Sequence, residues 1–104
     1  MTKRINLIVD DKPVDTDYFI EGFLDHTVAG MVMSLEGTPK IRKQIETIDI
    51  AANAGQVKIS VNSQAVPVNM FVNKLFTNTL TGLVSSLKGV VDPKKIEIHI
   101  ESGN

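Results

Sequence analysis

Residues 5–37, INLIVDDKPVDTDYFIEGFLDHTVAGMVMSLEG, align without a gap on residues 57–89, VKISVNSQAVPVNMFVNKLFTNTLTGLVSSLKG. Nine of the 33 aligned pairs are identical, whereas unrelated sequences of this composition would share roughly two or three. The identical pairs are Val9/Val61, Val14/Val66, Phe19/Phe71, Thr27/Thr79, Gly30/Gly82, Val32/Val84, Ser34/Ser86, Leu35/Leu87 and Gly37/Gly89. The offset of 52 residues indicates two diverged copies of one unit, at residues 4–52 and 56–101 of a single domain spanning residues 1–104.

Each copy begins and ends with an alternating apolar pattern that is typical of a half-buried strand. Between these strands the apolar residues recur with a helical period, which predicts helices over residues 18–36 and 70–88. Asp17 and Asn69 stand where N-caps are expected, and Gly37 and Gly89 stand where the helices should end. The order of elements is therefore β-α-β repeated twice.

This order predicts an α+β fold, a ferredoxin-like two-layer sandwich in which an antiparallel sheet carries both helices on one face. The first strand of each copy would then be central, and the segments near 45–50 and 96–101 would form the edges. A two-residue deletion in the second copy would align Ile48 and Ile50 with Ile98 and Ile100. The alternative adds strands at Val14 and Val66, which gives β-β-α-β repeated twice.

Composition excludes several kinds of function. The chain has 104 residues, no cysteine and a net charge of −1, so thiol chemistry and disulfides are excluded and no strong field for nucleic acid is expected. No apolar run approaches the roughly 20 residues that span a bilayer, and no secretory signal is visible. We therefore expect a cytoplasmic protein without cofactor, nucleic-acid partner or membrane association. Residues 1–52 carry a charge of −3 and residues 53–104 a charge of +2, which could favour contact between copies.

Both predicted helices are apolar over a wider arc than one sheet needs to cover. Small residues four apart, at Gly30 and Ser34 and again at Gly82 and Ser86, allow another backbone to approach closely. A glycine inside a helix costs about 1 kcal/mol relative to alanine, so two equivalent glycines indicate a packing reason. We expect these four residues to contact the other helix or the sheet, with a subunit interface as the alternative.

Two charged segments are candidate ligand sites. Asp10, Asp11, Asp15 and Asp17 are clustered oxygen ligands of the kind that Ca²⁺ or Mg²⁺ prefers, although their spacing matches no EF-hand. The basic residues in the two helix-to-strand loops could hold an anion; they are Lys40, Arg42, Lys43, Lys94 and Lys95. The structural alternatives are a solvated turn with a helix cap and solvated loop lysines.

The two histidines suggest no complete catalytic group. His26 lies on the first predicted helix, and His99 lies between Glu97 and Glu101 on a strand, where carboxylates favour the protonated imidazole. No nucleophile elbow, P-loop or dinucleotide-binding motif is present. We expect a non-enzymatic module for protein association or homo-oligomerisation. The alternative is a ligand-binding or catalytic domain whose pocket forms between subunits, from Asp10, Asp11, His99 or the loop lysines.

Overall fold

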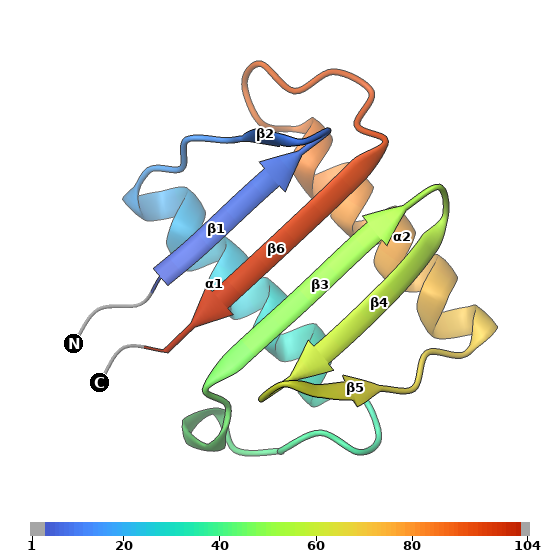
Figure 1. Cartoon of the computed structure of the whole chain (residues 1–104). Helices are drawn as coiled ribbons and strands as arrows, with labels where there is room; N and C mark the ends of the chain where they lie inside the picture. The colour runs from blue at the N-terminus through green and yellow to red at the C-terminus, as the bar shows by residue number, and fades with distance from the viewer. Residues whose placement is uncertain (1–3, 103–104) are drawn as a thin grey trace.

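The computed structural model describes residues 4–102 as a mixed α+β fold with six strands and two helices (Figure 1). The strands are β1 (Arg4–Val9), β2 (Lys12–Pro13), β3 (Thr47–Asn53), β4 (Gln56–Val61), β5 (Gln64–Val66) and β6 (Lys95–Glu101). The helices are α1 (Tyr18–Met33) and α2 (Met70–Ser85), and a 3₁₀ turn, η1, covers Arg42–Gln44. The short strands β2 and β5 make the β-β-α-β order the better description of each half.

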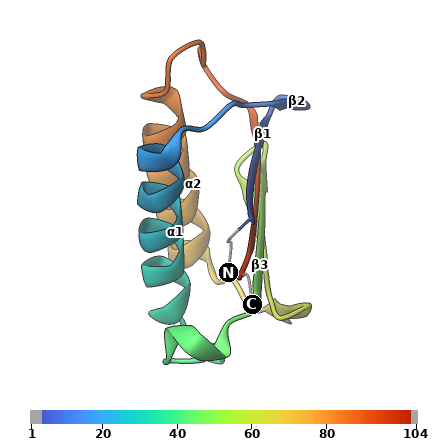
Figure 2. The same cartoon turned by 90° about the vertical axis from the view of Figure 1, so that its left-hand side faces the viewer.

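The molecule has two layers, with both helices on one face of the sheet (Figure 2). The inward residues of the four long strands are mostly buried and alternate with more accessible, largely polar residues, as an antiparallel sheet covered on one side requires. These inward residues pack against Leu24, Val28 and Val32 of α1 and Phe76, Leu80 and Val84 of α2. One apolar layer between helices and sheet therefore holds the fold together.

The strand order is β2-β1-β6-β3-β4-β5, with every neighbouring pair antiparallel. The last strand of each half, β3 or β6, is central, and the edges are the arms β2 and β5. Our prediction of edge strands near 45–50 and 96–101 is therefore wrong. The reason is that β3 and β6 pair with each other over their whole length, from Thr47↔Glu101 to Asn53↔Lys95.

The two halves have matching elements at fixed offsets. α2 has the bounds of α1 shifted by 52 residues, and β6 has the bounds of β3 shifted by 48. The connection between helix and last strand is therefore four residues longer in the first half, not two as the sequence alignment suggested. In strand pairing Ile48 corresponds to Ile96, because Val9 pairs with Ile96 just as Val61 pairs with Ile48.

Local signals in the sequence are realised at both helix starts. The Asp17 side chain accepts a hydrogen bond from the Ile20 N–H, and Asn69 does the same for Val72, both at 2.8 Å. The helices end at Met33 and Ser85, three residues earlier than predicted. Gly37 and Gly89 nevertheless adopt the left-handed conformation expected of them, with φ of 84° and 86°.

Between Arg4 and Ser102, neither helix has the length and apolar character needed to cross a membrane.

Candidate functional site

The outer surface of the two helices exposes large apolar side chains at equivalent positions. Phe19 of α1 and Phe71 of α2 are 70 % and 72 % exposed, and Phe23 and Leu75 are 49 % and 45 % exposed. Phe19 and Phe23 contact each other in a tilted arrangement, with ring centroids 6.1 Å apart. Complete burial of a fully exposed side chain of this kind contributes roughly 1.5–3 kcal/mol, so this surface is the candidate interface of the molecule.

A groove of about 400 Å³ runs between the helices on this surface. It is lined on one side by the N-terminal half of α1, including Phe19 and Phe23, and on the other by the C-terminal half of α2, including Leu83 and Ser86. The helices therefore run antiparallel. In the groove, Phe19 and Phe23 of α1 lie across from Ser86, which directly follows α2. We call the surface formed by Phe19, Phe23, Gly30, Ser34, Phe71, Leu75, Gly82 and Ser86 the helix face.

The small residues of the helix face do not pack inside the domain. Gly30 and Gly82 are exposed, and a Cβ added to either would meet nothing within 4 Å. The hydroxyls of Ser34 and Ser86 donate to the carbonyls of these glycines, each at 2.9 Å. The expected contact of the glycines with the other helix or the sheet is therefore wrong, because both positions face open space. The alternative, a subunit interface at these residues, stays a prediction.

The aspartate-rich segment serves as structural support. Asp10 Oδ1 accepts from the backbone N–H groups of Lys94 and Lys95, at 3.0 and 2.8 Å. Asn62, its equivalent, accepts from Glu46 and Thr47 in the same way. Asp10 thus fastens the start of β6 to the sheet, and Asn62 fastens the start of β3. The replacement of a charged aspartate by a neutral asparagine keeps these hydrogen bonds.

The predicted metal ligands do not converge. Asp10 binds backbone amides, Asp17 caps α1, Asp11 Oδ1 lies 2.9 Å from Lys95 Nζ, and Asp15 is exposed. Within residues 4–102 no three His, Asp or Glu side chains are grouped so that they could hold a metal ion. The structure thus offers no geometry in support of the predicted cation site.

The five basic loop residues lie at opposite ends of the sheet. Lys40, Arg42 and Lys43 precede β3, whereas Lys94 and Lys95 lie at the start of β6, which runs the opposite way. Lys94 pairs with Asp92 at 2.8 Å, and Lys95 pairs with Asp11 and Glu97. Lys40 Nζ donates to the Met33 and Leu35 carbonyls at the end of α1. A joint anion site from all five is therefore not formed.

Arg42 has a structural partner that the sequence did not reveal. Its guanidinium lies 2.9 Å from the carboxylate of Asp25, whose side chain is 3 % exposed, and it also donates to the Ile45 carbonyl and the Ser102 hydroxyl. The longer connection in the first half positions Arg42 over α1. The equivalent of Asp25 is Thr77, so this ion pair belongs to one half alone.

The open sheet face carries an Asp–His pair between its central strands. Asp49 Oδ1 lies 2.5 Å from His99 Nδ1, and Glu101 Oε1 lies 3.4 Å from Nε2. The hydrogen bond to Asp49 raises the pKa of His99 above its ordinary value, and Glu101 adds to the increase while partial burial opposes it. Both ring nitrogens face carboxylates, which favours the protonated imidazole, and neither nitrogen is left open to accept a proton as a general base would.

A shallow depression of about 290 Å³ surrounds this pair. Its lining consists of equivalent residues from both halves: Asn6/Lys58, Ile8/Ser60, Asp49/Glu97, Ile50/Ile98 and Ala51/His99. It has polar groups of both signs and lies open on the flat face of the sheet. It is the strongest feature for the alternative function, the binding of a small polar ligand.

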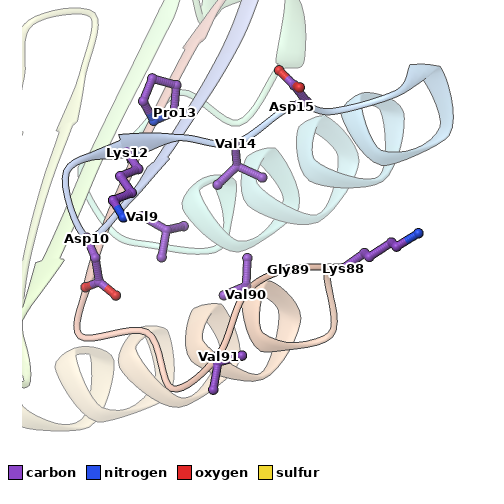
Figure 3. Close-up of a pocket in the computed structure, with 10 residues that line it drawn as sticks. All are labelled: Val9, Asp10, Lys12, Pro13, Val14, Asp15, Lys88, Gly89, Val90 and Val91. Atoms are coloured by element: carbon purple, nitrogen blue, oxygen red, sulfur yellow. The ribbon is translucent and has the colours of Figure 1, made fainter.

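The larger cavity, about 590 Å³, lies at one end of the sheet (Figure 3). Val9, Val14 and Val90 form its apolar part, and the charged residues Asp10, Lys12, Asp15 and Lys88 surround them. It lies between the β1–β2 arm and the connection from α2 to β6. This connection is shorter than the equivalent one from α1 to β3. In Figure 3 the Lys88 side chain points away from the cavity, so the charged residues that line the cavity do not converge on one ligand position.

Comparison with protein-family models, with curated proteins and with solved structures finds no match for this chain.

Proposed function

We propose that this protein is a non-enzymatic association module whose helix face binds a second copy of the same chain. The observation that carries the proposal is the exposure of Phe19, Phe23, Phe71 and Leu75 on one face of the molecule. A homodimer interface must be self-complementary, since the same patch occurs on both subunits. The helix face meets this requirement, because both of its helices carry exposed bulky apolar residues and an open glycine position.

The dimensions of the molecule also support a dimer. It is a slab of 35 × 34 × 18 Å, and the helices cover one broad side. A stable interface buries roughly 800 Å² on each partner, which such a side can supply. Within the described part of the chain, the other candidate sites give weaker support for a binding function, because their charged groups are paired or do not converge on one point.

We further infer that the chain arose by duplication of one β-β-α-β unit. The nine identical pairs at one offset, the matched caps and the equivalent roles of Asp10 and Asn62 support this inference. Under this history the helix face is itself nearly twofold symmetric.

Light scattering coupled to size exclusion tests the association. We expect the wild-type chain to elute as a dimer and Phe19→Ser/Phe71→Ser to elute as a monomer with unchanged circular dichroism. Val91→Ser is the matched control, since Val91 is 85 % exposed but lies on the loop after α2, and it should stay dimeric. A wild-type monomer at all concentrations up to the millimolar range would rule the proposal out.

Gly30→Leu provides a second test. In the single chain the new side chain starts in open space, so folding should be retained, but it would fill the hollow that a partner needs. We expect a folded monomer. A dimer of wild-type affinity would contradict the use of this glycine in the interface.

A further inference from the structure

The two helices of the helix face differ in charge. Residues 14–37, which contain α1, have five acidic residues and no lysine or arginine; the acids are Asp15, Asp17, Glu21, Asp25 and Glu36. Asp25 is buried and paired with Arg42, which leaves four acids near the surface. Residues 66–89, which contain α2, have Lys74 and Lys88 and no acid. Apart from Lys40, which donates to carbonyls at the end of α1, the charged side chains in and beside α1 are therefore mostly acidic, whereas those in and beside α2 are basic.

Building on the proposed dimer, we propose that α1 of each copy packs on α2 of the other, around a twofold axis parallel to the helices. This axis exchanges the acidic and basic halves of the facing surfaces. A twofold axis across the helices would instead place α1 on α1 and α2 on α2. Both arrangements set large residues over small ones, so packing does not separate them. Charge does, because like charges face each other in the second arrangement.

The groove lining gives the pairing of residues in the preferred arrangement. The groove of one chain is lined by Phe19, Phe23 and Thr27 of α1 and by Thr79, Leu83 and Leu87 of the antiparallel α2 segment, and we infer from this that Phe23 is level with Leu83 and Phe19 with Leu87. When α1 faces α2 of the second copy at that same level, Phe23 lies over Gly82 and Leu75 lies over Gly30. The glycines leave open space for these side chains.

Pairing residues at the same level along the helices also places the Lys88 ammonium of one copy near Asp15 and Asp17 of the other. Both partners are exposed in the single chain, so the contact needs no rearrangement. In the rejected arrangement Lys88 would instead approach Met70 and Lys74 of the other copy. A charge reversal at Lys88 should therefore weaken the dimer in the preferred arrangement and strengthen it in the rejected one, which distinguishes the two arrangements.

The first test is Lys88→Glu, measured by the concentration dependence of dimer dissociation. We expect the dissociation constant to rise about tenfold, because the twofold axis changes two such contacts at once. Adding Asp15→Lys to the same chain should restore most of the affinity. A tighter Lys88→Glu dimer would overturn the α1-on-α2 arrangement and leave the dimer itself standing.

Cysteine crosslinking gives an independent test, since the chain has no cysteine of its own. A mixture of Gly22→Cys and Ser85→Cys proteins should form a mixed disulfide, because the proposed pairing brings these positions, one half-buried and one exposed, to matching levels on α1 and α2. The His26→Cys protein by itself should not form a disulfide between its two copies. It would do so if α1 packed on α1, because the two introduced cysteines would then face each other. If light scattering shows a dimer, crosslinking of His26→Cys with itself would overturn the inference, and so would the absence of a mixed disulfide between Gly22→Cys and Ser85→Cys. If light scattering shows a monomer, the proposed function itself is overturned.

Discussion

The carboxylate of Asp49 on β3 lies 2.5 Å from the imidazole of His99 on β6, and the pair joins the closing strands of the two halves at the centre of the sheet. The equivalent pair is Glu97 with Ala51, which cannot form such a bond. The contact is therefore formed by only one of the two equivalent residue pairs. Opposite charges on directly paired strands stabilise a sheet, whereas like charges destabilise it.

This pair predicts how stability depends on pH. The folded-state pKa of His99 is raised, so its contribution is fully present below the unfolded value of about 6.5 and is lost as pH rises through the folded value. His99→Gln should therefore destabilise the protein most at low pH and progressively less above neutrality. Urea unfolding of both proteins between pH 5 and 9 measures this. Asp49→Asn should remove most of the difference, and a difference that grows with pH would contradict the assignment.

Breaking the Asp25–Arg42 pair should be costly. Arg42→Met leaves a carboxylate buried without its main cation, and we expect a loss of about 3 kcal/mol in the free energy of unfolding. The matched control is Lys43→Met, an exposed neighbour whose removal should change stability by less than about 0.5 kcal/mol. Asp25→Thr added to Arg42→Met, which introduces the residue of the second half, should recover part of the loss in chemical denaturation. An additive double loss would mean that the two side chains are not coupled.

The sequence was sufficient to predict the two helices, their N-caps and the four long strands, because these depend on local periodicity and local hydrogen bonding. It left the short strands β2 and β5 open and placed both helix ends three residues too late. It was insufficient for the strand order, because the pairing of β3 with β6 depends on contacts between segments far apart in the chain. It also misplaced Ile48 by two residues relative to β6. A shift of two keeps every side chain on the same face of a strand, so alternation cannot detect it.

The candidate site was only partly accessible to sequence reasoning. The repeated Gly and Ser positions pointed to the helix face, but only the structure shows that Gly30 lies in open space. The differences between Asp10 and Asn62 and between Asp17 and Asn69 appeared to mark chemistry in one half. Their oxygens make the same hydrogen bonds, because an amide and a carboxylate both accept from a backbone N–H.

Gly82 should limit the stability of the isolated chain. It lies inside α2 with open space around it, so Gly82→Ala should stabilise the fold by about 1 kcal/mol through helix propensity. The measurement belongs in the Phe19→Ser/Phe71→Ser background, where association does not contribute. Ser85→Ala in the same background is the control for a surface change without a glycine, and it should have a smaller effect. A destabilised Gly82→Ala monomer would mean that the glycine packs within the domain after all.

The β3–β4 turn contains a strained residue. Ala54 adopts φ of 53° before Gly55 at φ of 79°, which is the two-residue hairpin turn that favours Asn-Gly. A left-handed conformation costs alanine roughly 1–2 kcal/mol, and asparagine tolerates it better. Ala54→Asn should therefore raise the free energy of unfolding by about 1 kcal/mol, while Gly55→Ala should lower it by a similar amount. Denaturant unfolding of the two variants checks both signs. An Ala54→Asn protein no more stable than wild type would show that this turn is not strained.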